Sequence, residues 1–141
     1  MKQYIGTKMV MAEPALEPEI KFNRRQGYKV VYPPDGYESW SPRDVFENAY
    51  RETTGMNFGL ALEACKMGEK IARTGWNGKG MYVFLAHDPD FNAYADIPEF
   101  DGLEDVQLPD VLVMKTAQGA FHVGWLASQA DMLADDWCIV E

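Results

Sequence analysis

The chain has 141 residues, a length that suits one ordinary domain or a small domain with an appendage. Hydrophobic residues make up 47% of it and aromatic residues 13%, which is enough to build a packed core. No apolar run approaches the roughly 20 residues that span a bilayer, and the first residues lack the apolar stretch of a signal peptide. We therefore expect a soluble, intracellular protein that does not enter a membrane.

The net charge of −9 is unevenly distributed. Residues 1–54 are balanced, so residues 55–141 carry the whole excess of acidic groups. Binding to a long phosphate backbone depends on many Lys and Arg contacts, so DNA or RNA is not expected as a partner. A single small anion is still compatible, because one local cation and a few backbone amides can hold it.

The first part of the chain predicts a small strand–turn–strand–helix segment. Ser41 is the expected N-cap of the helix, with Pro42 at its first position and its end near Arg51. The region before the first strand has acidic, proline-containing steps without periodicity, which indicates a loop or extended segment. The predicted ranges are 11–26 for that segment, 28–32 and 37–40 for the strands, and 33–36 for the turn.

A polar, glycine-containing joint at 53–55 predicts a division into segments 1–54 and 56–141. The second segment favours an antiparallel sheet with packed helices, so the predicted fold class is α+β. Its predicted helices are 58–67, capped by Asn57 and followed by Gly68, and 128–134. Its predicted strands are 70–73, 81–86, 111–116, 120–123 and 137–140, and the acidic stretch 87–110 reads as a long loop.

The turn at 73–80 has the densest functional signal. Asn77 and Gly78 favour a turn with positive φ, and the neighbouring glycines let backbone amides approach a ligand. Trp76 offers a flat surface on which a planar base could stack. The alternative is an ordinary β-turn whose tryptophan packs in the core. The turn is not a P-loop, because no serine or threonine follows its lysine.

A second block runs from Trp125 to Trp137. Ser128, Gln129 and Asp131 fall in the first turn of the predicted short helix, whose free amides attract an acceptor. Asp131 has an equally plausible role in capping that helix. The two aspartates at 135–136 read most simply as a solvated helix end.

Nothing in the sequence indicates catalysis, a metal or a cofactor. Ser128 lies in no nucleophile motif, and Asp131 has no histidine near it in sequence to form an acid–base pair. The cysteines and histidines are isolated, without the spacing of a zinc site; these are Cys65, Cys138, His87 and His122. The sequence predicts binding without chemistry.

Five stretches of the chain resemble the second Thoeris anti-defence family of phages and prophages. They begin with Met-Asn-Phe-Gly at 56–59 and Ala-Leu-Glu-Ala at 61–64, and include Met-Lys-Thr-Ala at 114–117. The longest are Ile-Ala-Arg-Thr-Gly-Trp-Asn-Gly-Lys-Gly-Met at 71–81 and Trp-Leu-Ala-Ser-Gln-Ala-Asp-Met-Leu-Ala-Asp-Asp-Trp at 125–137. The similarity covers residues 56–141. Segment 1–54 is similar instead to a small phage module of unknown role.

The resemblance implies a molecular sponge. Such proteins bind cyclic ADP-ribose-type signals, and some bind cyclic dinucleotides, without degrading them, in pockets between the subunits of a homotetramer. Trp76 and Trp125 would then stack on the purine. The resemblance also places polar contacts to ribose and phosphate on Asn77, Gly78, Ser128, Gln129 and Asp131. The expected location is the cytoplasm of the infected bacterial host.

Two alternatives stay open at this stage. In the first, the chain is a structural or interaction protein of a phage, and Trp76 and Trp125 belong to its core. In the second, less favoured one, it is a nucleotide hydrolase, which would need a general base that the sequence does not offer.

Overall fold

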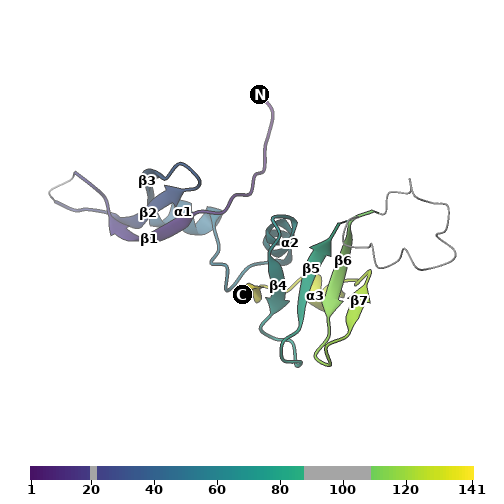
Figure 1. The fold of residues 1–141 in the computed structure, drawn as a ribbon. Helices are drawn as coiled ribbons and strands as arrows, with labels where there is room; N and C mark the ends of the chain where they lie inside the picture. The colour runs from purple at the N-terminus through teal and green to yellow at the C-terminus, as the bar shows by residue number, and fades with distance from the viewer. Residues whose placement is uncertain (20–21, 88–108) are drawn as a thin grey trace. The chain divides into compact units, whose positions relative to one another are not determined.

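The computed structural model describes residues 1–19, 22–87 and 109–141. It divides into two compact units, Met1–Glu52 and Thr53–Glu141 (Figure 1). The acidic loop predicted at 87–110 lies outside the described residues except at its ends. None of the described helices has the length and apolar character needed to cross a membrane.

The first unit is a three-stranded antiparallel sheet followed by one short helix. The strands lie in chain order, β1 (Met11–Leu16), β2 (Gln26–Tyr32) and β3 (Tyr37–Pro42), and α1 follows at Arg43–Ala49. Tyr28 of β2 stacks on Phe46 of α1, with ring centroids 4.3 Å apart. This contact joins the helix to one face of the sheet, on which Val30 is fully buried.

For this unit, one prediction was incomplete and one was wrong. Part of the segment 11–26 is strand β1, which pairs with β2 along its whole length although its own sequence has no alternation. The helix begins at Arg43, because the backbone of Ser41 and Pro42 continues β3; Pro42 is the N-cap and provides no side-chain hydrogen bond. Sheet pairing therefore takes precedence over the local serine–proline signal.

The described residues of the second unit form a five-stranded antiparallel sheet with two helices. Its strand order is β7-β6-β5-β4-β8, so the last strand of the chain pairs with β4 (Figure 1). The strands are β4 (Lys70–Arg73), β5 (Tyr82–Ala86), β6 (Val111–Lys115), β7 (Phe121–Val123) and β8 (Trp137–Val140), and the helices are α2 (Phe58–Lys66) and α3 (Gln129–Met132). The antiparallel sheets and their helices confirm the predicted α+β class.

The core of this unit lies between α2 and one face of the sheet. Asn57 caps α2 as predicted, accepting a hydrogen bond from the Leu60 amide at 2.9 Å. The small helix residues let the helix pack closely on the strands. The buried cluster consists of Met56, Ala61, Ala64, Cys65, Ile71, Val83, Met114 and Trp137.

The opposite face of the sheet carries a separate, smaller apolar cluster. Ala86 and Val113 are buried there, with Phe84 and Val111 packed against them. Because side chains alternate along a strand, Tyr82 and Lys115, which are register partners, lie on this same face. No described helix contributes to this cluster.

Candidate functional site

Three tryptophans from distant parts of the second unit meet edge to face. The ring centroid of Trp76 lies 5.3 Å from that of Trp137 and 6.1 Å from that of Trp125, with interplanar angles of 77° and 75°. Edge-to-face rings at such distances attract one another beyond simple burial. Trp137 is fully buried, whereas Trp76 and Trp125 are partly exposed and pack at the border of the core. Trp76 and Trp125 therefore combine a structural contact with an accessible aromatic surface.

Asp131 connects these rings to α3. Its Oδ1 accepts a hydrogen bond from the indole Nε1 of Trp76 at 3.0 Å, and its backbone oxygen accepts one from Trp137 Nε1 at 2.9 Å. Its Oδ2 accepts from the Ser128 hydroxyl at 2.8 Å and from the Ser128 amide at 3.2 Å, and the Ser128 hydroxyl accepts from the Asp131 amide. The capping box predicted for α3 is present, and it also fixes the orientation of Trp76.

Arg73 forms hydrogen bonds with two aspartates, Asp131 in α3 and Asp136 just before β8. Its guanidinium donates through Nη1 to Asp131 at 2.9 Å and through Nε to Asp136 at 2.8 Å. The side chain of Arg73 is only 19% exposed, and those of Asp131 and Asp136 are 13% and 31% exposed. Asp136 also accepts from the Gly75 amide at 2.7 Å. One arginine thus ties the turn after β4 to α3 and to the start of β8.

The glycines of the turn are needed for close packing. A Cβ on Gly75 would lie 2.7 Å from the Asp136 carboxylate, and one on Gly78 would lie 2.4 Å from the Met81 sulfur. A Cβ on Gly78 would also lie 2.8 Å from the side chain of Ala117 in the β6–β7 hairpin. At these two positions the missing side chain lets the turn approach its neighbours. The positive φ predicted at Asn77 and Gly78 is wrong: in this turn the positive φ, 70°, is at Gly80.

Four of the seven predicted site residues contact one another, and all seven lie on two separate segments. The turn after β4 carries Trp76, Asn77 and Gly78, and the β7–α3 connection and α3 carry Trp125, Ser128, Gln129 and Asp131. Trp76 joins the two segments, because its ring contacts that of Trp125 and its indole donates to Asp131; the Ser128–Asp131 bond lies within the second segment. The side chains of Asn77 and Gln129 are exposed beside this group.

Sequence reasoning missed Arg73 and Asp136 as determinants of the site. Asp136 is no solvated helix end: it bonds Arg73, the Gly75 amide and the Thr74 hydroxyl, the last at 3.3 Å. The only sequence signal was an arginine at the end of one predicted strand and an acidic pair before another. Their proximity follows from the β4–β8 register, in which Arg73 pairs with Trp137.

The electrostatics of Asp131 disfavour proton transfer. Partial burial by itself raises its pKa, but hydrogen bonds from Trp76, Arg73 and Ser128 outweigh this and lower the pKa from 3.8 to about 2. Hydrogen bonding from Arg73 is also the main cause that lowers the pKa of Asp136. Both groups are therefore ionised at neutral pH and act as hydrogen-bond acceptors.

The depressed pKa of Asp131 predicts acid sensitivity. Because the folded-state pKa lies below the unfolded value, the stabilisation is complete above that value and is lost as pH falls from 3.8 towards about 2. The shift corresponds to about 2 kcal/mol of folding free energy. Urea unfolding across this range should show a shallower pH slope for Asp131→Asn than for wild type. Equal slopes would mean that Asp131 does not carry the effect.

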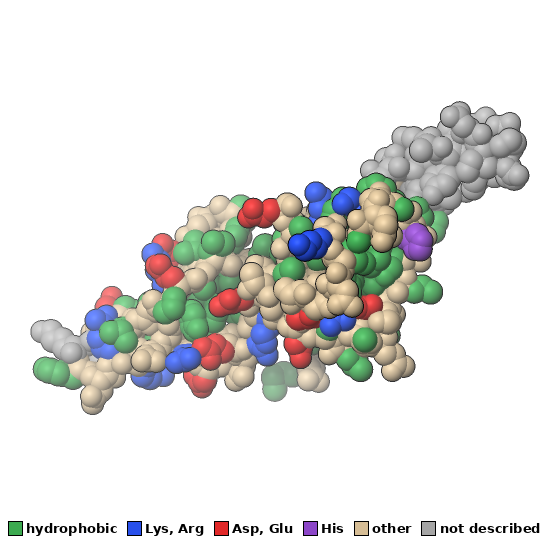
Figure 2. Space-filling model, turned by 90° about the horizontal axis from the view of Figure 1, so that it is seen from below, with side chains coloured by type: hydrophobic (Ala, Val, Ile, Leu, Met, Phe, Trp, Pro, Cys, Tyr) green, Lys and Arg blue, Asp and Glu red, His purple; other side chains and the backbone are tan. Residues whose placement is uncertain are grey.

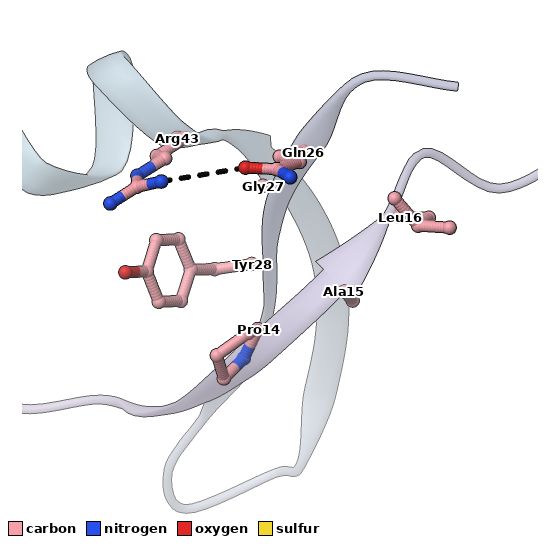
Figure 3. Close-up of a pocket in the computed structure, with 7 residues that line it drawn as sticks. All are labelled: Pro14, Ala15, Leu16, Gln26, Gly27, Tyr28 and Arg43. Atoms are coloured by element: carbon pink, nitrogen blue, oxygen red, sulfur yellow. Dashed lines mark hydrogen bonds between the residues drawn. The ribbon is translucent and has the colours of Figure 1, made fainter. Parts of the chain in front are cut away.

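A hollow of about 380 Å³ in the first unit lies apart from these residues (Figure 3). Pro14, Leu16, Gln26, Tyr28 and Arg43 line it, between β1, β2 and the start of α1. Its polar groups bond one another and α1: Arg43 Nη1 donates to Gln26 at 3.4 Å, and the Tyr28 hydroxyl donates to Glu47 at 2.9 Å. None of the predicted site residues lies in this unit.

The second unit is thus a small antiparallel α+β domain with a tryptophan-bearing turn held against a short capped helix. A family model, the Thoeris anti-defense 2-like domain, matches residues 56–140. The chain is also 38% identical over 95 residues to Thoeris anti-defense 2 of Bacillus phage SP01. The aligned region covers 62% of this chain and 97% of the phage protein. The chain belongs to the Thoeris anti-defense 2-like family, which confirms the predicted resemblance.

Membership makes this chain a phage anti-defence protein that acts in the infected host. The family match contains every predicted site residue and begins after the first unit ends. Residues 1–55 therefore lie outside the matched domain.

Proposed function

We propose that the protein binds a cyclic ADP-ribose-type immune signal, and cyclic dinucleotides as a second ligand class, and sequesters them without degrading them. The observation that carries this proposal is the partly exposed Trp76–Trp125 pair. Stacking of a base on an aromatic side chain contributes about 1–3 kcal/mol per base. The exposed polar groups of Asn77, Ser128 and Gln129 beside the pair suit the oxygen-rich sugar and phosphates of the same ligand.

Within this proposal, Asp131 positions Trp76 rather than reacting with the ligand. Its two carboxylate oxygens already accept hydrogen bonds from Trp76, Arg73 and Ser128. A carboxylate so well supplied with donors, with a pKa of about 2, is a poor general base near neutral pH. This supports binding without turnover. A direct contact between Asp131 and the ligand stays a prediction.

We further propose that the protein works as a homotetramer in the cytoplasm of the infected bacterium. Large apolar side chains are exposed on β7, on the connection to α3 and on α3 itself, and such exposed apolar surface favours association. These are Phe121, Val123, Leu126, Met132 and Leu133. Analytical ultracentrifugation of the full chain should give four times the monomer mass; a purely monomeric protein would contradict this assembly.

Calorimetric titration of the full chain with a panel of cyclic ADP-ribose isomers and cyclic dinucleotides tests the function. At least one compound should bind tightly, and heat denaturation should release it chemically unchanged. Recovery of a hydrolysed product would instead establish the hydrolase alternative. A structural phage protein would bind nothing, whereas a ligand at 100 times its dissociation constant adds about 2.7 kcal/mol to stability.

Trp76→Ala and Trp125→Ala test the stacking assignment. Each should weaken binding about tenfold or more, because 1.4 kcal/mol corresponds to a factor of ten in affinity. Trp40→Ala in the first unit is the matched control and should leave affinity unchanged. Thermal melting of each variant establishes that it is folded, and Asn77→Ala, an exposed change, tests the polar contacts without touching the core. Unchanged affinity in both tryptophan variants would exclude the assignment.

A further inference from the structure

Two lysines flank the ring of Tyr82 on the sheet face opposite α2. The Nζ atoms of Lys70 and Lys115 lie 5.3 and 5.5 Å from the centre of that ring. Lys115 is the register partner of Tyr82, and Lys70 lies on the same face of β4 because its neighbour Ile71 faces the α2-side core. Cation–π attraction holds each ammonium near the ring.

Lys115 is also fixed to the turn that contains the predicted site. Its Nζ donates to the carbonyl oxygen of Gly80 at 3.3 Å. Lys79 precedes Gly80 in the same turn and is exposed. The turn therefore has Trp76 packed against the α2-side core, while its end at Gly80 meets a lysine of the other face. Figure 2 shows Lys and Arg side chains on the face that it views, with Asp and Glu side chains among them.

These lysines have no carboxylate partner among the residues that the structure describes. The other basic side chains of this unit are paired, Lys66 with Glu63 and Arg73 with two aspartates. The absence of pairing is notable, because the acidic groups of residues 55–141 far outnumber the basic ones. The ammonium groups of Lys70 and Lys115 are no farther apart than the sum of their two distances to the Tyr82 ring. At low ionic strength, where the Debye length is about 30 Å, the two like charges therefore repel each other.

We propose that Lys70 and Lys115, spaced by Tyr82, form a binding site for a diphosphate group, with Lys79 adding charge from the turn. An anion with two linked phosphates neutralises both ammonium groups at once, which a single carboxylate does not. Lysine binds phosphate as a point charge and does not require the planar match that arginine offers. The anion site stands on the lysine geometry alone; its assignment to the diphosphate of a nucleotide signal rests on the proposed function.

The test compares wild type with the double variant Lys70→Gln/Lys115→Gln by calorimetric titration at low ionic strength. Inorganic pyrophosphate is the first probe. Wild type should bind it, with an affinity that falls as salt rises, and the double variant should bind at least tenfold more weakly. The matched control is Lys29→Gln/Lys66→Gln, which removes two lysines that are ion-paired with Glu38 and Glu63. This control should retain wild-type affinity for pyrophosphate.

Failure of wild type to bind pyrophosphate, or an equal loss in the control, would overturn the site. A second arm uses cyclic ADP-ribose to separate the two sources of diphosphate. If the double variant loses affinity for both pyrophosphate and cyclic ADP-ribose, the site is assigned to the diphosphate of the nucleotide. Loss of pyrophosphate binding alone keeps the anion site and overturns its assignment to the nucleotide. If wild type binds pyrophosphate but no signalling nucleotide, the proposed function fails and the anion site stands.

Discussion

Replacing Trp137 by alanine is expected to lower the free energy of unfolding of the second unit by about 4 kcal/mol. Trp137 is fully buried, and its ring contacts those of Phe58, Trp76 and Trp125, at centroid distances of 5.3, 5.3 and 6.3 Å. Its removal leaves a cavity and also deprives the Asp131 carbonyl of a hydrogen-bond donor. Because the tryptophans pack on one another, the variant should also bind the proposed ligand more weakly.

Hydrogen exchange of the β4 and β8 amides, measured at increasing urea concentrations, gives the free energy of unfolding of the second unit alone. Met67→Ala is the control, since Met67 is 53% exposed, lies outside the proposed association surface, and its truncation should change stability by no more than about 0.5 kcal/mol. A loss below about 1 kcal/mol in Trp137→Ala would show that the aromatic cluster is not the centre of the core.

Replacing Arg73 by methionine should cost the same unit about 3 kcal/mol at neutral pH. The change leaves Asp131 and Asp136 partly buried without their cation, and removing one partner of a buried ion pair costs about 3–5 kcal/mol, less where water reaches the groups. Its hydrogen bond to Asp136 is the main cause that raises the pKa of Arg73, so the arginine is charged throughout the accessible range. Arg73→Lys should recover only part of the loss, because lysine lacks the forked geometry that spans two carboxylates.

The pH dependence separates loss of charge pairing from loss of packing. Without Arg73, the pKa values of both aspartates should rise, so the deficit of Arg73→Met should shrink as acid protonates them. Arg43→Met is the matched control: Arg43 pairs with Glu47 one turn along α1 and is well exposed, which predicts about 0.5 kcal/mol or less. A deficit that does not change with pH would assign the role of Arg73 to packing alone.

Arg73 also holds the proposed ligand site in a fixed conformation. Its bond to Asp131 holds the carboxylate that orients Trp76, and its bond to Asp136 holds the acceptor of the Gly75 amide. The turn is thus preorganised from its core side. A preorganised surface loses less conformational entropy on binding than a mobile loop does.

Much of the second unit could be predicted from short segments of sequence. The Asn57 cap, the hairpin around Gly119 and the capping box of Ser128 and Asp131 are all local signals, and each is present in the structure. Local prediction succeeded there because the partners lie within a few residues of one another. It failed at Ser41 and did not find strand β1 within 11–26, because in both places the backbone pairs with β2.

In the candidate site, too, local features could be predicted from the sequence and contacts between distant residues could not. Trp76 and Trp125 could be identified from their surroundings in sequence, but the clamp of Arg73 on Asp131 and Asp136 could not. Its partners lie 58 and 63 residues away, and only the pairing of β4 with the last strand brings them together. Tyr82 and the two lysines beside it likewise come from three different strands.

The sequence by itself determined the elements with local signals, the α+β class, the charge imbalance and the family. Each of these depends on residue type and on spacing within a few turns of chain. Only the tertiary structure decided that Asp131 and Asp136 share one arginine and that two unpaired lysines face one ring. The physical reason is that strand order and register are set by burying a common core, and no short stretch of sequence encodes that outcome.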